Sequence, residues 1–261
     1  GEILIISPDG NMSSHSLLNE NETSPLHKCV YEEVYFGLPS SDVFGIPVHE
    51  FRKELGRRLA NLFGHLIKPD DIITNIPDSS NSFAEGFCKA LGCELTTIIL
   101  RRHYVGRSFT KENQMVIDDT LREKFSFLGS VIGNILKKNP DARFWIIEDS
   151  IVRGNTIRKI ARVLRGFGVK FIGVLSGAPP ILGDCGKGID MKGRGGRLIA
   201  ADHVISGLSV DCRSIAAETE VNFVGYQPLA DLYDTVRHFS KDPGDFCFGC
   251  FENREPIWGK W

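Results

Sequence analysis

The sequence predicts an α/β fold with a parallel sheet flanked by helices. From residue 48 onwards, short apolar runs alternate with segments of helical period, and polar turns follow several of the apolar runs. A composition of 42% hydrophobic and 25% charged residues is typical of a globular protein. With no internal repeat or linker, we expect residues 1–261 to form a single domain: opening strands and loop at 1–40, a ligand-binding core at 41–210, and a C-terminal segment at 211–261.

The expected elements follow in chain order. Residues 2–6 and 29–36 are β-rich, and the polar stretch from Pro8 to Pro25 indicates a loop. Apolar residues three and four apart, from Val48 to Leu66, predict a helix. The pattern then predicts strands at 72–76, 97–100, 144–147 and 171–175, helices at 83–91 and 157–167, and a mobile loop at 104–120. Ligands of such sheets bind at the carboxyl ends of the strands.

Charge and composition exclude several classes of partner. A net charge of −2 predicts neither a nucleic-acid surface nor a membrane surface. No apolar run approaches the roughly 20 residues of a membrane span, and the N-terminus lacks a signal-peptide pattern. We therefore expect a cytoplasmic protein whose seven cysteines are thiols or ligands. The start at Gly1, without Met, suggests a processed, trimmed or incompletely represented chain.

The most informative segment is E-D-S-I-V-R-G-N-T at 148–156, between a predicted strand and a predicted helix. Backbone N–H groups of such a loop and of the helix N-terminus bind anions, and hydroxyl groups add donors. The carboxylates of Glu148 and Asp149 suit sugar hydroxyls. The predicted anion-binding residues are Ser150, Ile151, Val152, Arg153, Gly154, Asn155 and Thr156. The alternative is a plain strand-to-helix turn with Asp149 or Ser150 as the N-cap.

This segment resembles the phosphoribosylpyrophosphate (PRPP) motif of type I phosphoribosyltransferases, in the D-D-S-I-V-R-G-T-T form of amidophosphoribosyltransferases. N-I-P-D-S-S at 75–80 resembles the family's V-P-D-S-S loop, and H-Y-V-G-R-S-F at 103–109 resembles its flexible N-R-Y-V-G-R-T-F loop. G-E-I at 1–3 resembles the linkage after the family's glutaminase domain, which has no counterpart in this sequence. The sequence departs from the family pattern at Glu148, Asn155, His103 and Ile117.

The resemblance implies a type I phosphoribosyltransferase fold with a flexible active-site loop, and PRPP-dependent transfer to an amine. Ammonia as the acceptor would give 5-phosphoribosylamine and pyrophosphate, as in purine biosynthesis. The implied catalytic residues are Glu148, Asp149, Tyr104, Arg107 and Lys124. Asp78, Ser79 and Ser80 would face the Mg²⁺-pyrophosphate, with Mg²⁺ near Glu148 and Asp149. The implied partners are a glutaminase domain or subunit and further copies of the chain.

These motifs also fit simpler structures and different activities. The 77–80 segment fits a turn that caps the next helix, and the basic loop fits a solvated surface. His103 and Ile117 leave room for a transferase with another nucleophile, or for a PRPP-sensing protein without turnover.

The cysteines point to a second site. Cys247 and Cys250 have the C-x-x-C spacing that metals and clusters favour. Cys29, Cys185, Cys247 and Cys250 match the ligand positions of iron–sulfur members of the family. The resemblance therefore implies a 4Fe–4S cluster that ties down the C-terminal segment. Zinc with four thiolates and four unliganded thiols are the alternatives. Cys88, Cys93 and Cys212 match no ligand position and are expected to be core or surface thiols.

Overall fold

A sheet of four parallel strands lies at the centre of the described residues. The computed structural model describes residues 2–16, 27–102, 124–185, 189 and 196–254. The strand order in the sheet is β13 (Phe223–Tyr226), β10 (Phe171–Ser176), β9 (Arg143–Glu148) and β6 (Ile72–Asn75). All three neighbouring pairs are parallel. The predicted α/β fold with a parallel sheet is confirmed.

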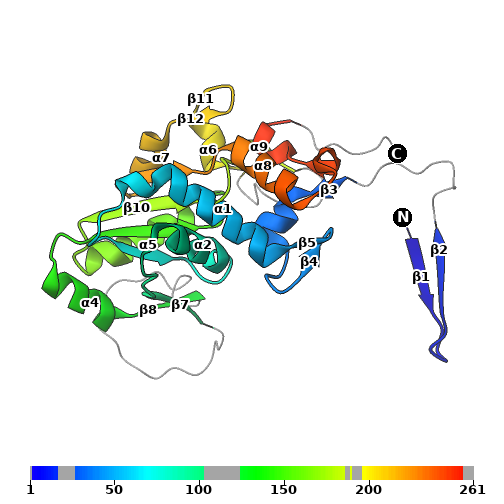
Figure 1. The fold of residues 1–261 in the computed structure, drawn as a ribbon, viewed down its shortest axis with the longest axis horizontal. Helices are drawn as coiled ribbons and strands as arrows, with labels where there is room; N and C mark the ends of the chain where they lie inside the picture. Colours follow the sequence, from blue (N-terminus) through cyan, green and yellow to red (C-terminus); the bar gives the residue numbers. More distant parts are fainter. Residues whose placement is uncertain (1, 17–26, 103–123, 186–188, 190–195, 255–261) are drawn as a thin grey trace.

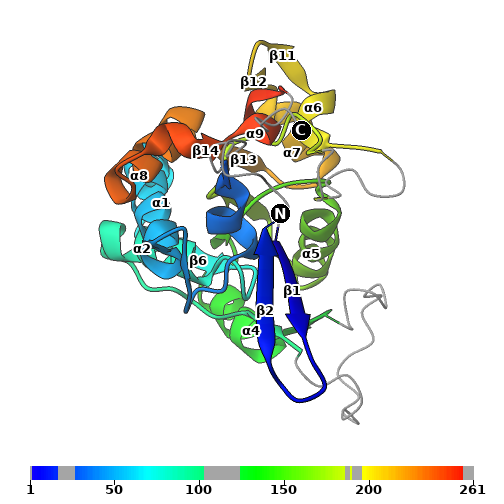
Figure 2. The same ribbon diagram turned by 90° about the vertical axis from the view of Figure 1, so that its right-hand side faces the viewer.

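Helices cover both faces of this sheet, because alternate side chains of each strand point to opposite faces. On β9, Phe144 and Ile146 belong to one buried cluster, whereas Trp145 and Ile147 belong to the other. The first cluster includes side chains of α4 (Gly129–Lys138), α5 (Asn155–Gly166) and α7 (Cys212–Glu218). The second includes α1 (Val48–Phe63), α2 (Asn81–Leu91) and α8 (Leu229–Phe239). Figure 2 shows α1, α2 and α8 on one side of the sheet and α5 and α7 on the other.

The segment at 29–36 is not a strand, contrary to the sequence prediction. Only β3 (Lys28–Cys29) is extended, and a π-helix, η1 (Glu32–Phe36), follows it. The N–H of Gly37 donates to the carbonyl of Glu32 at 2.7 Å, which closes a wide i→i+5 turn. Val30, Tyr31 and Val34 are buried, and this spacing suits a helix rather than a strand.

Two further expectations need correction. The predicted loop after Pro8 contains β2 (Met12–Ser16), which forms an exposed antiparallel hairpin with β1 (Glu2–Ile6). Figure 1 shows this hairpin standing apart from the rest of the chain. The strand predicted at 97–100 is β7 (Ile99–Arg101), which pairs antiparallel with β8 (Phe125–Phe127), outside the central sheet. The loop predicted at 104–120 lies outside the described residues.

The C-terminal segment packs back on the start of the domain. The strand β14 (Phe246–Cys247) pairs with β3 in parallel. Phe246, Phe248 and Phe251 are buried in the second cluster, so apolar burial and backbone pairing hold this segment in place. The remaining short elements are β4 (Asp42–Val43), β5 (Ile46–Pro47), η2 (Gly64–Leu66), α6 (Ile199–Asp202), β11 (Val204–Ser206), β12 (Ser209–Val210), η3 (Pro243–Asp245) and α9 (Gly249–Glu252). Among the helices described, none is both long and apolar enough to cross a bilayer.

Candidate active site

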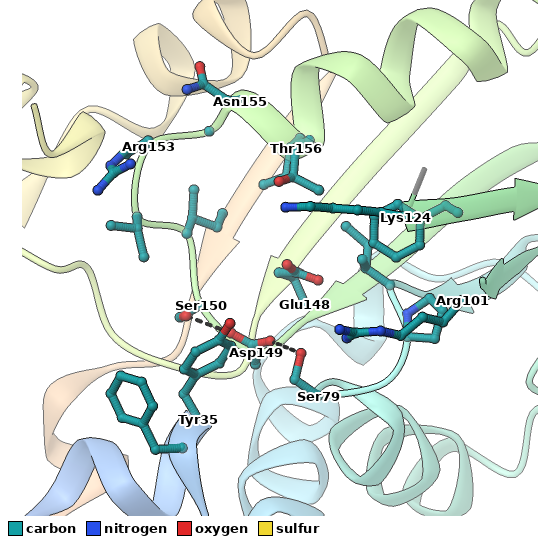
Figure 3. Close-up of a pocket in the computed structure, with 18 of the residues that line it drawn as sticks. Tyr35, Ser79, Arg101, Lys124, Glu148, Asp149, Ser150, Arg153, Asn155 and Thr156 are labelled. Carbon is teal, nitrogen blue, oxygen red and sulfur yellow. Dashed lines mark hydrogen bonds between the residues drawn. The ribbon is translucent and has the colours of Figure 1, made fainter. Parts of the chain in front are cut away.

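A cavity of about 450 Å³ opens at the carboxyl edge of the sheet, where β9 and β6 end. The loop between β9 and α5 and the loop between β6 and α2 form two of its walls. Eleven of the predicted site residues line it: Ser79, Lys124, Glu148, Asp149, Ser150, Ile151, Val152, Arg153, Gly154, Asn155 and Thr156. Figure 3 shows the acid pair, Glu148 and Asp149, between the 150–156 loop and the side chains of Arg101 and Lys124. Parallel strands bring segments about 70 residues apart to one edge.

The acid pair lies deep in this cavity. Asp149 is 3% exposed, and its Oδ1 and Oδ2 accept hydrogen bonds from Ser150 Oγ at 2.6 Å and Ser79 Oγ at 2.5 Å. Glu148 is half-buried, and its Oε2 is shielded from solvent without a hydrogen-bond partner in the described part of the chain. Burial raises the pKa of Asp149, and burial together with the neighbouring Asp149 carboxylate raises the pKa of Glu148 well above its usual range. The unpaired oxygen is available to a hydroxyl donor or a cation.

The loop after the acid pair is shaped around Gly154. This residue has φ +72°, a left-handed conformation that L side chains rarely adopt, and it immediately precedes α5. A Cβ there would lie 2.7 Å from Thr219 Cγ2 and 2.8 Å from Ile199 Cδ1. In the described residues no side chain caps the N-terminus of α5, so its first N–H groups remain available to a ligand. This geometry suits a phosphate group.

Cationic side chains approach the cavity from β7 and β8. Arg101 at the end of β7 and Lys124 just before β8 both line it, and Figure 3 shows both reaching in from the same side. The N–H of Arg102 donates to the carbonyl of Lys124 at 2.9 Å, which keeps the two segments side by side. The predicted catalytic residues Tyr104 and Arg107 lie outside the described residues.

Two residues of the 77–80 segment do not line the cavity. Asp78 lies 3.7 Å from Arg101, measured between Oδ2 and Nε, and follows a cis peptide bond after Pro77. Ser80 is fully buried, donates its hydroxyl to the carbonyl of Ile76 and accepts from Asn75 Nδ2 at 3.2 Å. Ser80 thus stabilises the turn before α2, whereas Ser79 faces the acid pair.

The sequence prediction missed the wall formed by η1. Tyr31, Tyr35 and Phe36 line the cavity, and the hydroxyl oxygens of Tyr31 and Ser150 lie 3.0 Å apart in a buried hydrogen bond. Arg101 was also missed as a site residue. The aromatic side chains at 29–36 favour a strand in the sequence, so they gave no indication of this wall.

A buried arginine side chain stabilises η1. Arg52 of α1 is 1% exposed and donates from Nε to the carbonyl of Glu33 and from Nη2 to that of Gly37, both at 2.8 Å. Its charge also opposes the burial-driven rise in the pKa of Asp149. Glu33 is fully buried, neither carboxylate oxygen has a partner among the described residues, and burial raises its pKa to about 8. An arginine on the apolar stripe of α1, one turn after Val48, was the signal that could have revealed this support.

The structure brings the four predicted ligand thiols to one place. Cys29 and Cys247 are aligned on the paired strands β3 and β14. The carbonyl of Cys250 accepts from the N–H groups of Leu182 and Gly183 at 2.9 Å, and the thiols of Cys29 and Cys250 interact electrostatically with those of Cys185 and Cys247. Burial raises the pKa of Cys29 to about 11. In the described ranges, however, no group of three His, Cys, Asp or Glu side chains is placed to hold a metal ion.

Comparison with known proteins agrees with this geometry. Amidophosphoribosyltransferase 1, chloroplastic, from Arabidopsis thaliana is 32% identical over 266 residues, which cover 98% of this chain and 41% of the relative. The amidophosphoribosyltransferase of Bacillus subtilis (strain 168) is 32% identical over 256 residues, 98% of this chain and 49% of the relative. The chain is homologous to the amidophosphoribosyltransferases. The resemblance inferred from the motifs is thereby confirmed, although no protein-family model matches the chain.

Solved structures extend the similarity to three dimensions. The glutamine PRPP amidotransferase of B. subtilis, complexed with ADP and GMP, has a TM-score of 0.71 at 30% identity. That match covers 98% of this chain and 52% of the other. The structure of the allosteric regulatory enzyme of purine biosynthesis has a TM-score of 0.72 at 29% identity, and the match covers the whole of this chain and 52% of the other chain. The chain spans about half the length of these amidophosphoribosyltransferase homologues.

Proposed function

We propose that this chain transfers the phosphoribosyl group of PRPP to an amine, with ammonia as the acceptor. The nitrogen lone pair attacks C1, the bond from C1 to the pyrophosphate oxygen breaks, and pyrophosphate leaves with the bonding electrons. The product, after loss of a proton from nitrogen, is 5-phosphoribosylamine. The observation that carries the proposal is the acid pair Glu148–Asp149 beside the open N-terminus of α5 in one cavity.

Each wall of the cavity has a role in this reaction. The loop from Ser150 to Thr156 would bind the 5-phosphate through its N–H groups and hydroxyls. Asp149 and Glu148 would accept hydrogen bonds from the ribose hydroxyls, which need acceptors when buried. Lys124 and Arg107 would neutralise the leaving pyrophosphate, and Tyr104 would close over it. Arg101 stands where it can join them. Positioning and charge stabilisation supply most of the catalysis in such a site.

Mg²⁺ is the cofactor proposed for the PRPP site. The unpartnered Glu148 Oε2 and the neighbouring Asp149 are oxygen donors of the kind Mg²⁺ prefers, and Mg²⁺ usually binds through one or two carboxylates plus substrate phosphates. Of the residues predicted for the Mg²⁺-pyrophosphate side, Ser79 lines the cavity, whereas Asp78 and Ser80 would hold the turn that carries it. Ser79 is the residue of this segment whose side chain contacts the acid pair.

A 4Fe–4S cluster is proposed on Cys29, Cys185, Cys247 and Cys250. The four thiols come from three separate segments and lie close enough to interact electrostatically, which supports a shared metal centre. A zinc ion would need all four sulfurs at about 2.3 Å from one centre, whereas a cubane distributes them over four irons. The role of the cluster would be structural, holding β14 and α9 against β3.

The chain would work within a larger assembly. We propose a single transferase domain in residues 1–261, supplied with ammonia by a glutaminase domain or subunit and assembled as a cytoplasmic homo-oligomer. Light scattering coupled to size-exclusion chromatography measures the oligomer directly. A monomer at every concentration would contradict that part of the proposal.

The decisive experiment measures pyrophosphate release from PRPP and Mg²⁺, with ammonium as acceptor, on anaerobically purified protein. The Asp149→Ala variant should lose release. The matched control is Asp141→Ala, an acid near the other end of β9 that pairs with Lys170 on the surface, which should keep full release. PRPP binding without ammonium-dependent release would refute the transferase proposal and favour another acceptor or a sensing role.

Metal content tests the cluster separately. Iron and acid-labile sulfide should be present in the wild type, lost in Cys250→Ser and retained in Cys212→Ser. Stoichiometric zinc in place of iron would refute the cluster and leave the transferase proposal intact.

A further inference from the structure

Two cysteines that neither the cavity nor the thiol cluster uses lie together at the C-terminal end of α2. The helix ends at Gly92, which has φ +67° and donates its N–H to the carbonyl of Cys88. The N–H of Cys93 donates to the same carbonyl at 3.1 Å. A left-handed glycine with a hydrogen bond from the following residue back five positions is the signature of the Schellman helix end. In that motif the side chains of the two bonded residues contact each other.

Both of those positions are cysteine here. A backbone hydrogen bond between two residues also limits the separation of their Cα atoms. The Cα–C and C=O bonds of Cys88, the 3.1 Å hydrogen bond and the N–Cα bond of Cys93 connect the two Cα atoms, so these atoms lie at most about 7 Å apart, and disulfides span Cα separations of roughly 4.4–6.8 Å. The cap therefore keeps the two cysteines within reach of a disulfide.

The two thiols differ in access to solvent. Cys88 is 6% exposed and packs in the buried cluster under α1 and α2. Cys93 is half-buried and lines a second cavity of about 1070 Å³, whose other lining residues include Leu91, Glu94 and Lys138. Burial and the contact with Cys93 raise the pKa of Cys88. A reagent from solvent therefore reaches the Cys93 thiol more readily than the Cys88 thiol.

We infer that Cys88 and Cys93 form a reversible intramolecular disulfide by exchange with a small disulfide such as oxidised glutathione. The Cys93 thiolate attacks one sulfur of the small disulfide, whose other half leaves as a thiolate. Cys88 then loses its proton and attacks the Cys93 sulfur, which expels the second small thiolate. Two protein thiols are oxidised, one small disulfide is reduced to two thiols, and the two protons pass to the departing thiolates.

The position of Lys89 allows a sharp test. Trypsin cuts after Lys89, between the two cysteines, and the resulting peptides 59–89 and 90–101 each contain a single cysteine. Native protein is equilibrated in glutathione buffers of increasing oxidised fraction, quenched with acid, alkylated, digested and analysed by mass spectrometry. The two peptides should appear as one disulfide-linked species, two hydrogens lighter than their sum, and dithiothreitol should separate them.

Single-cysteine variants distinguish the roles. Cys88→Ser should abolish the linked species and accumulate a glutathione adduct on Cys93, whereas Cys93→Ser should leave Cys88 unmodified. Cys212→Ser, which removes a half-buried thiol elsewhere, should form the link as the wild type does. A wild type that stops at the Cys93 adduct, or links only when circular dichroism shows unfolding, would overturn the inference. None of these measurements depends on the transferase activity.

Discussion

Replacing Gly154 by alanine should damage both stability and phosphate binding, for reasons that can be separated. Alanine must adopt φ +72°, and a left-handed conformation costs an L residue about 1–2 kcal/mol. The new Cβ would also meet Thr219 Cγ2 at 2.7 Å and Ile199 Cδ1 at 2.8 Å. Overpacking of this kind typically costs about 1–3 kcal/mol. The free energy of unfolding should therefore fall by about 2–5 kcal/mol in total.

The size of the expected movement links this change to function. Restoring ordinary contact of at least 3.4 Å from 2.7 Å requires a shift of about 0.7 Å, in the loop whose N–H groups we propose to bind phosphate. Misplacement on the 1 Å scale can cost up to about 100-fold in an active site. We expect PRPP affinity, measured by isothermal titration calorimetry, to fall at least about tenfold, or 1.4 kcal/mol.

Gly92→Ala is the matched control for backbone strain. Gly92 has nearly the same φ, +67°, but an added Cβ would meet no atom within 4 Å, and α2 ends there on the side away from Ser79. Urea denaturation should show a loss of about 1–2 kcal/mol and unchanged PRPP affinity. Equal destabilisation by the two substitutions would refute the contact argument. Wild-type affinity in Gly154→Ala would refute the role of the loop geometry.

Three further predictions concern charge. Glu33 has a pKa of about 8 in the folded protein against 4.5 in the unfolded chain, so the native state binds more protons between these values and stability falls as pH rises through them. Glu33→Gln should therefore have a larger free energy of unfolding than the wild type at pH 8. The difference in free energy between the two proteins should grow by up to about 1.4 kcal/mol per pH unit from pH 5. A difference that does not change with pH would contradict this prediction. Arg52→Met leaves the buried carbonyls of Glu33 and Gly37 without their hydrogen bonds, at about 1–3 kcal/mol each, so urea denaturation should show a loss of about 2–6 kcal/mol. Arg57→Met, on the exposed side of the same helix, should change stability by less than about 1 kcal/mol. The pKa values of Glu148 and Asp149 are raised in the free site, whereas a bound cation or ribose hydroxyls favour the ionised carboxylates. Binding of Mg²⁺-PRPP should therefore release protons, and its affinity should weaken as pH falls through the raised pKa values. Calorimetry in buffers of different ionisation enthalpy measures the release, and an undiminished release in Glu148→Gln would exclude Glu148 as a source.

The segment at 148–156 shows what local sequence can predict. Strand β9, the acid pair, the glycine turn and α5 follow one another without interruption, so residue types and spacing were enough to place Glu148, Asp149 and the 150–156 loop in one site. The helical stripe of α1 and the glycine end of α2 are likewise local signals, and both appear where the pattern indicated.

The segment at 29–36 shows where local sequence fails. Its β-branched and aromatic residues favour a strand, yet the buried Arg52 of a later helix binds the carbonyls of Glu33 and Gly37 and stabilises a π-helix instead. Tertiary contacts of this kind override weak local propensity. The aromatic wall of the cavity therefore emerged only from the folded chain.

The sequence by itself determined the alternation of strands and helices and the position of the 149–154 loop between β9 and α5, because each depends on neighbouring residues. Only the tertiary structure decided which side chains share the cavity: Ser79 turns to Asp149, while Ser80 turns into the protein and Arg101 joins from another strand. Only the fold revealed that Cys88 and Cys93 lie together at the end of α2. The physical reason is that burial and contact depend on elements far apart along the chain, whose packing no local pattern records.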